Sequence, residues 1–184
     1  MRRNSSLLDL LQELQALDRV PRAGYSLRGI AEPESVSEHA FHVTFLAWTL
    51  AAEEPGLDRL KTVELALVHD LAEVRTGDLP RTAARYLPAG AKSTAEMAAA
   101  QDLLAPLGDR AVELFAEYQA GETPEARFVA ACDKLQLLIK ASVYEKWGSR
   151  GLDEFWANLE DFADGGFESI GKVLAELKTR RDRR

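Results

Sequence analysis

A few histidines and acidic residues in apolar surroundings are the side chains of this sequence best suited to chemistry. The chain has three histidines, all in its two most apolar stretches: His39, His42 and His69. Asp70 directly follows the third of them, and Asp133 lies in another apolar stretch. Burying an imidazole or a carboxylate costs free energy unless it meets hydrogen-bond partners, an opposite charge or a metal ion. These residues are therefore candidates for a metal site.

Each candidate also has an ordinary structural interpretation. A single buried histidine is most often a core residue whose ring nitrogens are satisfied. Asp133 could pair with Lys134 or Arg127, or lie on an exposed helix face. Residue type alone leaves these alternatives open.

Helical spacing adds a further acid to the pair formed by His69 and Asp70. Glu73 is three residues after Asp70 and four after His69, so on a helix it would share their side. A histidine from the preceding helix and an aspartate from a distant one would complete a mixed nitrogen and oxygen set: His39, His69, Asp70 and Asp133. Such ligands suit Zn, Mn, Fe, Co or Ni and leave positions open for water and substrate.

The elements that must position these residues are helices, because helical periodicity runs through almost the whole chain. Ser35 or Ser37 is the expected N-cap of the first apolar helix, Gly77 the expected stop of the next, and Thr123 the cap of a long third one. The expected helices cover residues 6–17, 35–52, 60–75, 80–87, 92–105, 110–120, 123–147, 152–163 and 167–180, with loops at 18–24 and 29–33. No alternating runs flank a hairpin turn. We therefore predict an all-α fold, with residues 1–184 forming a single-domain helical bundle.

Length and composition exclude several classes of protein. The 184 residues include 23 Lys and Arg against 30 Asp and Glu, a net charge of −7, which disfavours binding to a nucleic acid polymer. The basic tail at 178–184 is most simply the charge-stabilised end of a helix. No apolar run is long enough to cross a membrane, and Cys132, the one cysteine, forms no intramolecular disulfide. We expect a cytoplasmic protein.

Three segments of the sequence resemble a known family. The pattern His39, His69, Asp70 and Asp133 resembles the HD-domain metal-dependent phosphohydrolase superfamily, which is named for its paired histidine and aspartate. The segments LDRVPR (17–22), ESVSEH (34–39) and LVHDLAEVRTGDLP (67–80) resemble the 5′-deoxynucleotidase family within it. The resemblance runs from about residue 7 to residue 146, and the C-terminal helices expected over 152–180 are less distinctive.

This resemblance implies an all-helical HD domain, commonly a homodimer, that hydrolyses deoxyribonucleoside 5′-monophosphates to deoxynucleoside and phosphate. It implies one divalent metal ion (Co, Mn, Zn, Fe or Ni) held by the family's ligand positions: His39, His69, Asp70 and Asp133. Glu73 matches the catalytic acid beside the attacking water, and Arg19 matches an arginine that orients the phosphate. Arg22 is the competing candidate for that arginine.

The resemblance also implies a substrate-contacting segment, which consists of Asp78, Leu79, Pro80 and Arg81. Two positions depart from some members of the family. Val20 stands where those members have an aromatic residue, and Arg81 stands where they have threonine. Both changes could alter nucleoside recognition without touching the phosphate chemistry. Asp78 is also a plausible helix cap.

Two other functions fit the same residues. A metal-dependent phosphohydrolase could act on another small phosphate ester or nucleotide, and a non-catalytic module could bind metal or nucleotide without turnover. His42 is expected to support the site or pack in the core, and Cys132 to be a small buried residue. The three tryptophans are expected to pack in the core or an interface: Trp48, Trp147 and Trp156.

Overall fold

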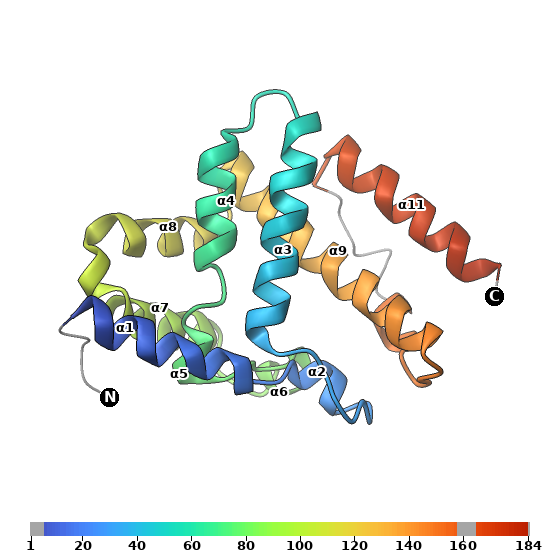
Figure 1. Cartoon of the computed structure of the whole chain (residues 1–184), viewed down its shortest axis with the longest axis horizontal. Coiled ribbons are helices and arrows are strands. Elements are labelled where there is room, and N and C mark those ends of the chain that lie inside the picture. Colours follow the sequence, from blue (N-terminus) through green and yellow to red (C-terminus); the bar gives the residue numbers. More distant parts are fainter. Residues whose placement is uncertain (1–5, 158–164, 184) are drawn as a thin grey trace.

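The computed structural model describes residues 6–157 and 165–183, and the regular elements in these ranges are helices (Figure 1). The predicted all-α fold is thus confirmed; the one β contact in the described part is an isolated bridge between Pro21 and Ser35. The elements are α1 (Leu7–Leu14), η1 (Gln15–Arg19), α2 (Ala23–Ser26), α3 (Val36–Leu50), η2 (Ala51–Glu53), α4 (Arg59–Val68), α5 (Glu73–Thr76), α6 (Arg81–Ala84), α7 (Ala91–Leu103), η3 (Ala105–Leu107), α8 (Asp109–Ala120), α9 (Pro124–Lys146), α10 (Asp153–Ala157) and α11 (Glu168–Asp182), with η denoting 3₁₀ helices.

The start of α3 is determined by a local hydrogen-bond pattern. The Ser35 hydroxyl accepts from the backbone N–H of Glu38, and the Glu38 carboxylate accepts from the backbone N–H of Ser35. This capping box satisfies two backbone donors that a helix start leaves unpaired. The predicted cap at Ser35 is confirmed, and it fixes the first turn of α3, next to His39.

The chain between α4 and α5 departs from the predicted continuous helix over 60–75. Residues 69–72 form successive turns instead. There the backbone N–H groups of Leu71 and Glu73 donate to carbonyls three residues back, not four. This tighter winding ends the regular helix just before His69 and Asp70, so the prediction is wrong at the position that bears them. Gly77, with a φ of 72°, ends α5 as predicted.

Helix α9 is the central element of the core. It packs against α3 and α4, which also pack against each other, and Figure 1 shows it passing behind both. The buried positions of α9 recur along most of its length and include Phe128 and Leu135. Because α3, α4 and α9 meet around this core, side chains far apart in sequence are brought to one place.

Other expectations differ from the structure in smaller ways. The predicted loop 18–24 contains the end of η1 and the start of α2. The predicted helix 152–163 is seen as α10, and residues 158–163 of it lie outside the described residues. His42 is exposed, so the expectation that it supports the site or packs in the core is wrong. Trp156 and Cys132 are buried, as expected.

No helix in the described part of the chain combines the length and the apolar composition needed to span a bilayer. The expected cytoplasmic location stays a prediction.

Candidate metal centre and its pocket

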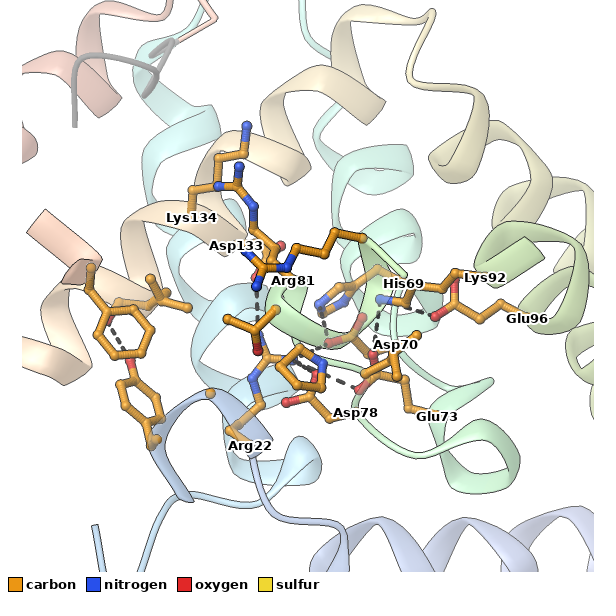
Figure 2. Close-up of a pocket in the computed structure, with 18 of the residues that line it drawn as sticks. Arg22, His69, Asp70, Glu73, Asp78, Arg81, Lys92, Glu96, Asp133 and Lys134 are labelled. Atoms are coloured by element: carbon orange, nitrogen blue, oxygen red, sulfur yellow. Dashed lines mark hydrogen bonds and ion pairs between the residues drawn. The ribbon is translucent and has the colours of Figure 1, made fainter. Parts of the chain in front are cut away.

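Three separate parts of the chain bring the predicted metal ligands together. His39 comes from the start of α3, His69 and Asp70 from the turns after α4, and Asp133 from the middle of α9. His39 and His69 are buried, and both aspartates are mostly enclosed. Figure 2 labels three members of this group, His69, Asp70 and Asp133, among the residues that line the pocket.

The distances within the group are short. His39 Nε2 lies 3.0 Å from Asp133 Oδ1 and 3.4 Å from Asp70 Oδ2. His69 Nε2 lies 3.2 Å from the same Asp70 oxygen. The ligand atoms of His39, His69 and Asp70 all lie within 4.8 Å of one another. The structure therefore brings all four predicted ligands into one cluster, with Asp133 joined to it through His39.

The ring nitrogens of the two histidines show what the cluster is suited to bind. Nε2 of His39 and Nε2 of His69 are buried and have no hydrogen-bond partner among the described residues. Their other nitrogens are satisfied, since His39 Nδ1 is 2.7 Å from Gln136 Oε1 and His69 Nδ1 is 2.7 Å from the carbonyl of Ala66. Two imidazole lone pairs thus face two carboxylates, and this donor set fits a divalent metal ion.

The charges in the cluster shift one another's pKa values. Burial opposes the ionisation of Asp70, but His69 and Arg22 outweigh it and hold the pKa of Asp70 well below its usual range. Burial likewise opposes a charge on His69, yet the carboxylate of Asp70 raises the pKa of this imidazole. Oppositely charged neighbours therefore dominate over desolvation at this pair.

Glu73 lies beside the cluster at the start of α5 and is buried. Its Oε2 makes no hydrogen bond within the described residues and is 3.8 Å from Arg22 Nη1, and its Oε1 is 3.8 Å from Lys92 Nζ. Burial, together with the carboxylates of Asp70 and Asp78, raises the pKa of Glu73 to about 9. A carboxyl group in such surroundings is able to hold a proton next to the centre.

The guanidinium of Arg22 lies among the carboxylates of the site. Its Nη atoms lie 3.4 Å from Asp70, 3.5 Å from Asp78, 3.8 Å from Glu73 and 3.9 Å from Asp133. Burial opposes its charge, but these carboxylates raise the pKa of Arg22 further above the ordinary arginine value. Asp78 also holds the Arg22 segment in place, because its Oδ2 accepts from the backbone N–H of Ala23 at 2.8 Å.

Arg19 and Val20 are not brought to this pocket. Arg19 is the last residue of η1 and is exposed, and Val20 is half-buried outside the pocket lining. The backbone explains the difference from Arg22: the Val20 carbonyl accepts from Val36, and the Arg22 N–H donates to the carbonyl of Glu34. This pairing fixes residues 20–22 against the start of α3, and the Arg22 side chain enters the site.

A pocket of about 780 Å³ opens over the cluster. Ligand pockets commonly have volumes of about 300–1,000 Å³. The predicted substrate-contacting segment lines it: Asp78, Leu79, Pro80 and Arg81. Four further cationic side chains line it, and sequence reasoning did not assign them to the site: Arg28, Arg85, Lys92 and Lys134. Figure 2 shows Lys92 beside Glu73 and Glu96, and it draws Arg81 and Lys134 among the side chains that line the pocket. Isolated basic residues such as these carry no sequence signal of their own.

Comparisons with known proteins agree with this fold. The model of the HD domain family matches residues 14–170. The 5′-deoxynucleotidase HDDC2 of Homo sapiens is 34% identical over 185 residues, covering 96% of this chain and 86% of that protein. The 5′-deoxynucleotidase hdd1 of Schizosaccharomyces pombe is 31% identical over 162 residues, covering 83% of this chain and 80% of that protein.

A solved structure is similar over nearly the full length as well. A conserved hypothetical protein from Pyrococcus furiosus has a TM-score of 0.80 and 36% identity, covering 96% of this chain and 99% of that one. The fold and site thus define an HD-domain protein. Within that class, the chain belongs to the 5′-deoxynucleotidase family.

Proposed function

We propose that this protein is a metal-dependent phosphomonoesterase that hydrolyses deoxyribonucleoside 5′-monophosphates to deoxynucleoside and phosphate. The observation that carries the proposal is the pair of buried, unpartnered Nε2 atoms of His39 and His69, which face Asp70 and Asp133 below a cation-lined pocket. The names of the relatives support the choice of substrate.

The proposed ligands of the metal ion are His39, His69, Asp70 and Asp133. When bound, a divalent ion of the kind this set suits (Co, Mn, Zn, Fe or Ni) lowers the pKa of its water toward neutrality and neutralises charge on a phosphate oxygen. The two aspartates supply the negative charge that compensates the cation, and burial of the imidazoles excludes competing solvent.

Glu73 is the residue proposed to manage the proton of the attacking water. Its Oε2 has no competing hydrogen bond in the described part of the chain, so it is available to take that proton and hold it. In the metal-free site the raised pKa keeps Glu73 protonated. The positive charge of a bound divalent ion would lower that pKa, so that the ionised carboxylate could accept the proton. Lys92, at 3.8 Å from Oε1, keeps the carboxyl group oriented from the other side.

Phosphate recognition is assigned to the cations of the pocket, with Arg22 as the central one. A guanidinium offers a planar fork that matches two phosphate oxygens. Arg22 is held beside the cluster, whereas Arg19, which the family pattern indicates, is exposed. Arg81 and Lys134 add positive charge to the pocket lining.

Nucleoside recognition is assigned to the segment from Asp78 to Arg81. Leu79 and Pro80 offer an apolar surface in the pocket, and Asp78 Oδ1 faces Arg22 at 3.5 Å while its other oxygen is bonded to Ala23. We propose that Asp78 positions Arg22 and also accepts from a sugar hydroxyl. The half-buried Val20 lies outside this contact surface.

The test is phosphate release from a panel of substrates with purified, metal-loaded protein. We expect turnover of deoxynucleoside monophosphates with added divalent metal and none with a chelator. His69→Ala and Asp70→Asn should abolish activity, whereas Glu64→Gln, which changes a surface carboxylate of α4 paired with Arg110, should not. Full activity of Asp70→Asn would contradict the proposal.

The same panel separates the alternatives. Faster turnover of ribonucleotides, cyclic nucleotides or sugar phosphates would favour a phosphohydrolase of another small ester. Tight nucleotide binding without turnover, with every metal tried, would favour a non-catalytic binding module.

We also propose that the protein is a homodimer. The support is an aromatic stripe along α3, formed by Phe41, Phe45 and Trp48, whose side chains are 64%, 54% and 54% exposed. The rings of Phe41 and Phe45 are stacked, and Phe45 contacts Trp48. An exposed, ordered apolar stripe of this kind is typical of a protein contact surface.

A further inference from the structure

A buried glutamine holds the first histidine of the cluster. Gln136 lies on α9, three residues after Asp133, so both side chains project from the same side of the helix. Its Oε1 is 2.7 Å from Nδ1 of His39, and Gln136 is only 2% exposed. A buried contact this short with a proposed ligand influences which ring nitrogen of His39 carries the hydrogen.

The orientation of the Gln136 amide is determined by a second buried residue. Its Nε2 donates to Oε2 of Glu34 at 2.9 Å. Because the NH₂ group of Gln136 donates to Glu34, the carbonyl oxygen of the same amide faces His39. The carbonyl oxygen in turn only accepts, so Nδ1 of His39 must carry the hydrogen.

Glu34 is itself held by two residues of α9. Lys140 Nζ lies 3.4 Å from Oε2 of Glu34 and compensates its charge. The Tyr144 hydroxyl accepts from the backbone N–H of Glu34 at 2.7 Å. The side chain of Glu34 is therefore buried beside a lysine, and its Oε1 lies 3.9 Å from Nδ1 of His39.

The position of this proton matters because the other nitrogen of His39 faces carboxylates. Asp133 Oδ1 at 3.0 Å and Asp70 Oδ2 at 3.4 Å from Nε2 would both stabilise a proton there. A proton on Nε2 would occupy the lone pair that a metal ion needs. His69 has no such dependence on a side chain, since its Nδ1 is bonded to the main-chain carbonyl of Ala66.

We propose that Glu34 and Gln136 form a positioning pair that keeps the hydrogen of His39 on Nδ1 and leaves Nε2 free for the metal ion. This inference rests on the proposed metal-dependent function. The inference gives a reason for the burial of Glu34 and Gln136, since burying polar side chains costs free energy.

Metal affinity is the first test, measured by chelator competition with Zn²⁺ and Co²⁺. Gln136→Met has similar volume but neither hydrogen bond, and we expect it to weaken metal binding by about 10–100-fold, the usual effect of losing such a partner. Its Co²⁺ absorption spectrum should change as well. Ser142→Ala is the matched control, because Ser142 is another buried polar residue of α9, bonded to the Ile139 carbonyl.

A swapped double variant separates positioning from packing. In Glu34→Gln with Gln136→Glu, the carboxylate at 136 accepts from His39 Nδ1 and from the amide at 34, so both hydrogen bonds are kept: the one from His39 has its original direction, and the one between residues 34 and 136 is reversed. We expect metal affinity within about threefold of the wild-type value, within the spread of context effects for such partners. Failure of the swap to recover any affinity would overturn the positioning role.

Nitrogen NMR of the metal-free protein gives a readout that does not depend on metal or substrate. The chain has three histidines, so their ring signals can be assigned by substitution. At alkaline pH we expect His39 to be protonated on Nδ1 in the wild type and on Nε2 in Gln136→Met. The same tautomer in both proteins, with equal metal affinity, would refute the inference.

These measurements also separate the inference from the proposed function. A wild-type protein that binds metal and shows the expected tautomer but releases no phosphate would refute the nucleotidase and leave the positioning pair standing. If the wild type releases phosphate and Gln136→Met binds metal as tightly as the wild type, the positioning pair is refuted and the nucleotidase function stands.

Discussion

His39 Nε2 and Asp133 Oδ1 lie 3.0 Å apart, although one residue belongs to the start of α3 and the other to the middle of α9. The contact exists because α3 and α9 pack directly against each other. Packing of the core thus positions part of the proposed centre. We expect substitutions at this contact to lower metal affinity more than they lower the free energy of unfolding.

Removal of the Asp133 carboxylate should disable the centre. Asp133→Asn keeps the shape but removes the charge, and we expect metal affinity to fall by more than about 100-fold, since even partners outside the ligand set cost 10–100-fold. Metal content after dialysis and phosphate release measure the effect. Glu122→Gln, which changes an exposed carboxylate just before α9, is the control. Retention of metal by Asp133→Asn would show that Asp133 is no ligand.

Arg22 and Arg19 should respond differently to the same substitution. Arg22→Lys replaces a planar fork with a point charge inside the site, and we expect kcat/KM to fall about 10–100-fold, the loss of roughly one charged hydrogen bond. Arg19→Lys, at an exposed position, should change it by less than about threefold. Steady-state kinetics on a deoxynucleoside monophosphate decide between them, and the reverse order would restore the assignment that the family pattern suggests.

The raised pKa of Glu73 has a consequence for the stability of the metal-free protein. Between the ordinary value of 4.5 and about 9, the folded protein holds the Glu73 proton and the unfolded chain does not. The free energy of unfolding should therefore fall as pH rises through this window, by up to about 1.4 kcal/mol per pH unit from this group.

Glu73→Gln isolates that contribution, because an amide does not titrate. In urea unfolding with a chelator present, we expect the variant to lose less stability than the wild type as pH rises from 4.5 toward 9. Parallel pH curves for the two proteins would show that Glu73 ionises normally in the folded state.

Metal binding should stabilise the fold. An ion that binds only the native state at 100 times its Kd adds about 2.7 kcal/mol to the free energy of unfolding. We expect Zn²⁺ or Co²⁺ to raise the melting temperature of the wild type and to leave that of His39→Ala nearly unchanged. An equal rise in both proteins would place the stabilising ion elsewhere.

The aromatic stripe on α3 should control the oligomeric state. Phe45→Glu puts a charge in the middle of the stripe, next to Phe41 and Trp48, and we expect it to convert a dimer to a monomer in sedimentation experiments. Lys172→Glu on α11 is an exposed charge change outside the stripe and serves as the control. A wild-type monomer would refute the dimer directly.

The sequence by itself determined the fold class, most helix boundaries and the identity of the proposed ligands. Caps such as Ser35, Gly77 and Thr123 act through hydrogen bonds or dihedral angles within a few residues, so they can be read without knowledge of the rest of the chain. The same holds for the adjacent His69 and Asp70, whose surroundings are apolar in the sequence itself.

Only the tertiary structure decided which arginine enters the site, where the helix breaks at residues 69–72, and that Glu34 and Gln136 hold His39. Each of these depends on contacts between segments that are distant along the chain, such as α3 with α9. Periodicity and capping carry no information about such contacts, because they describe the free energy of a segment with its neighbours in sequence. Burial and long-range hydrogen bonds arise only when the helices pack.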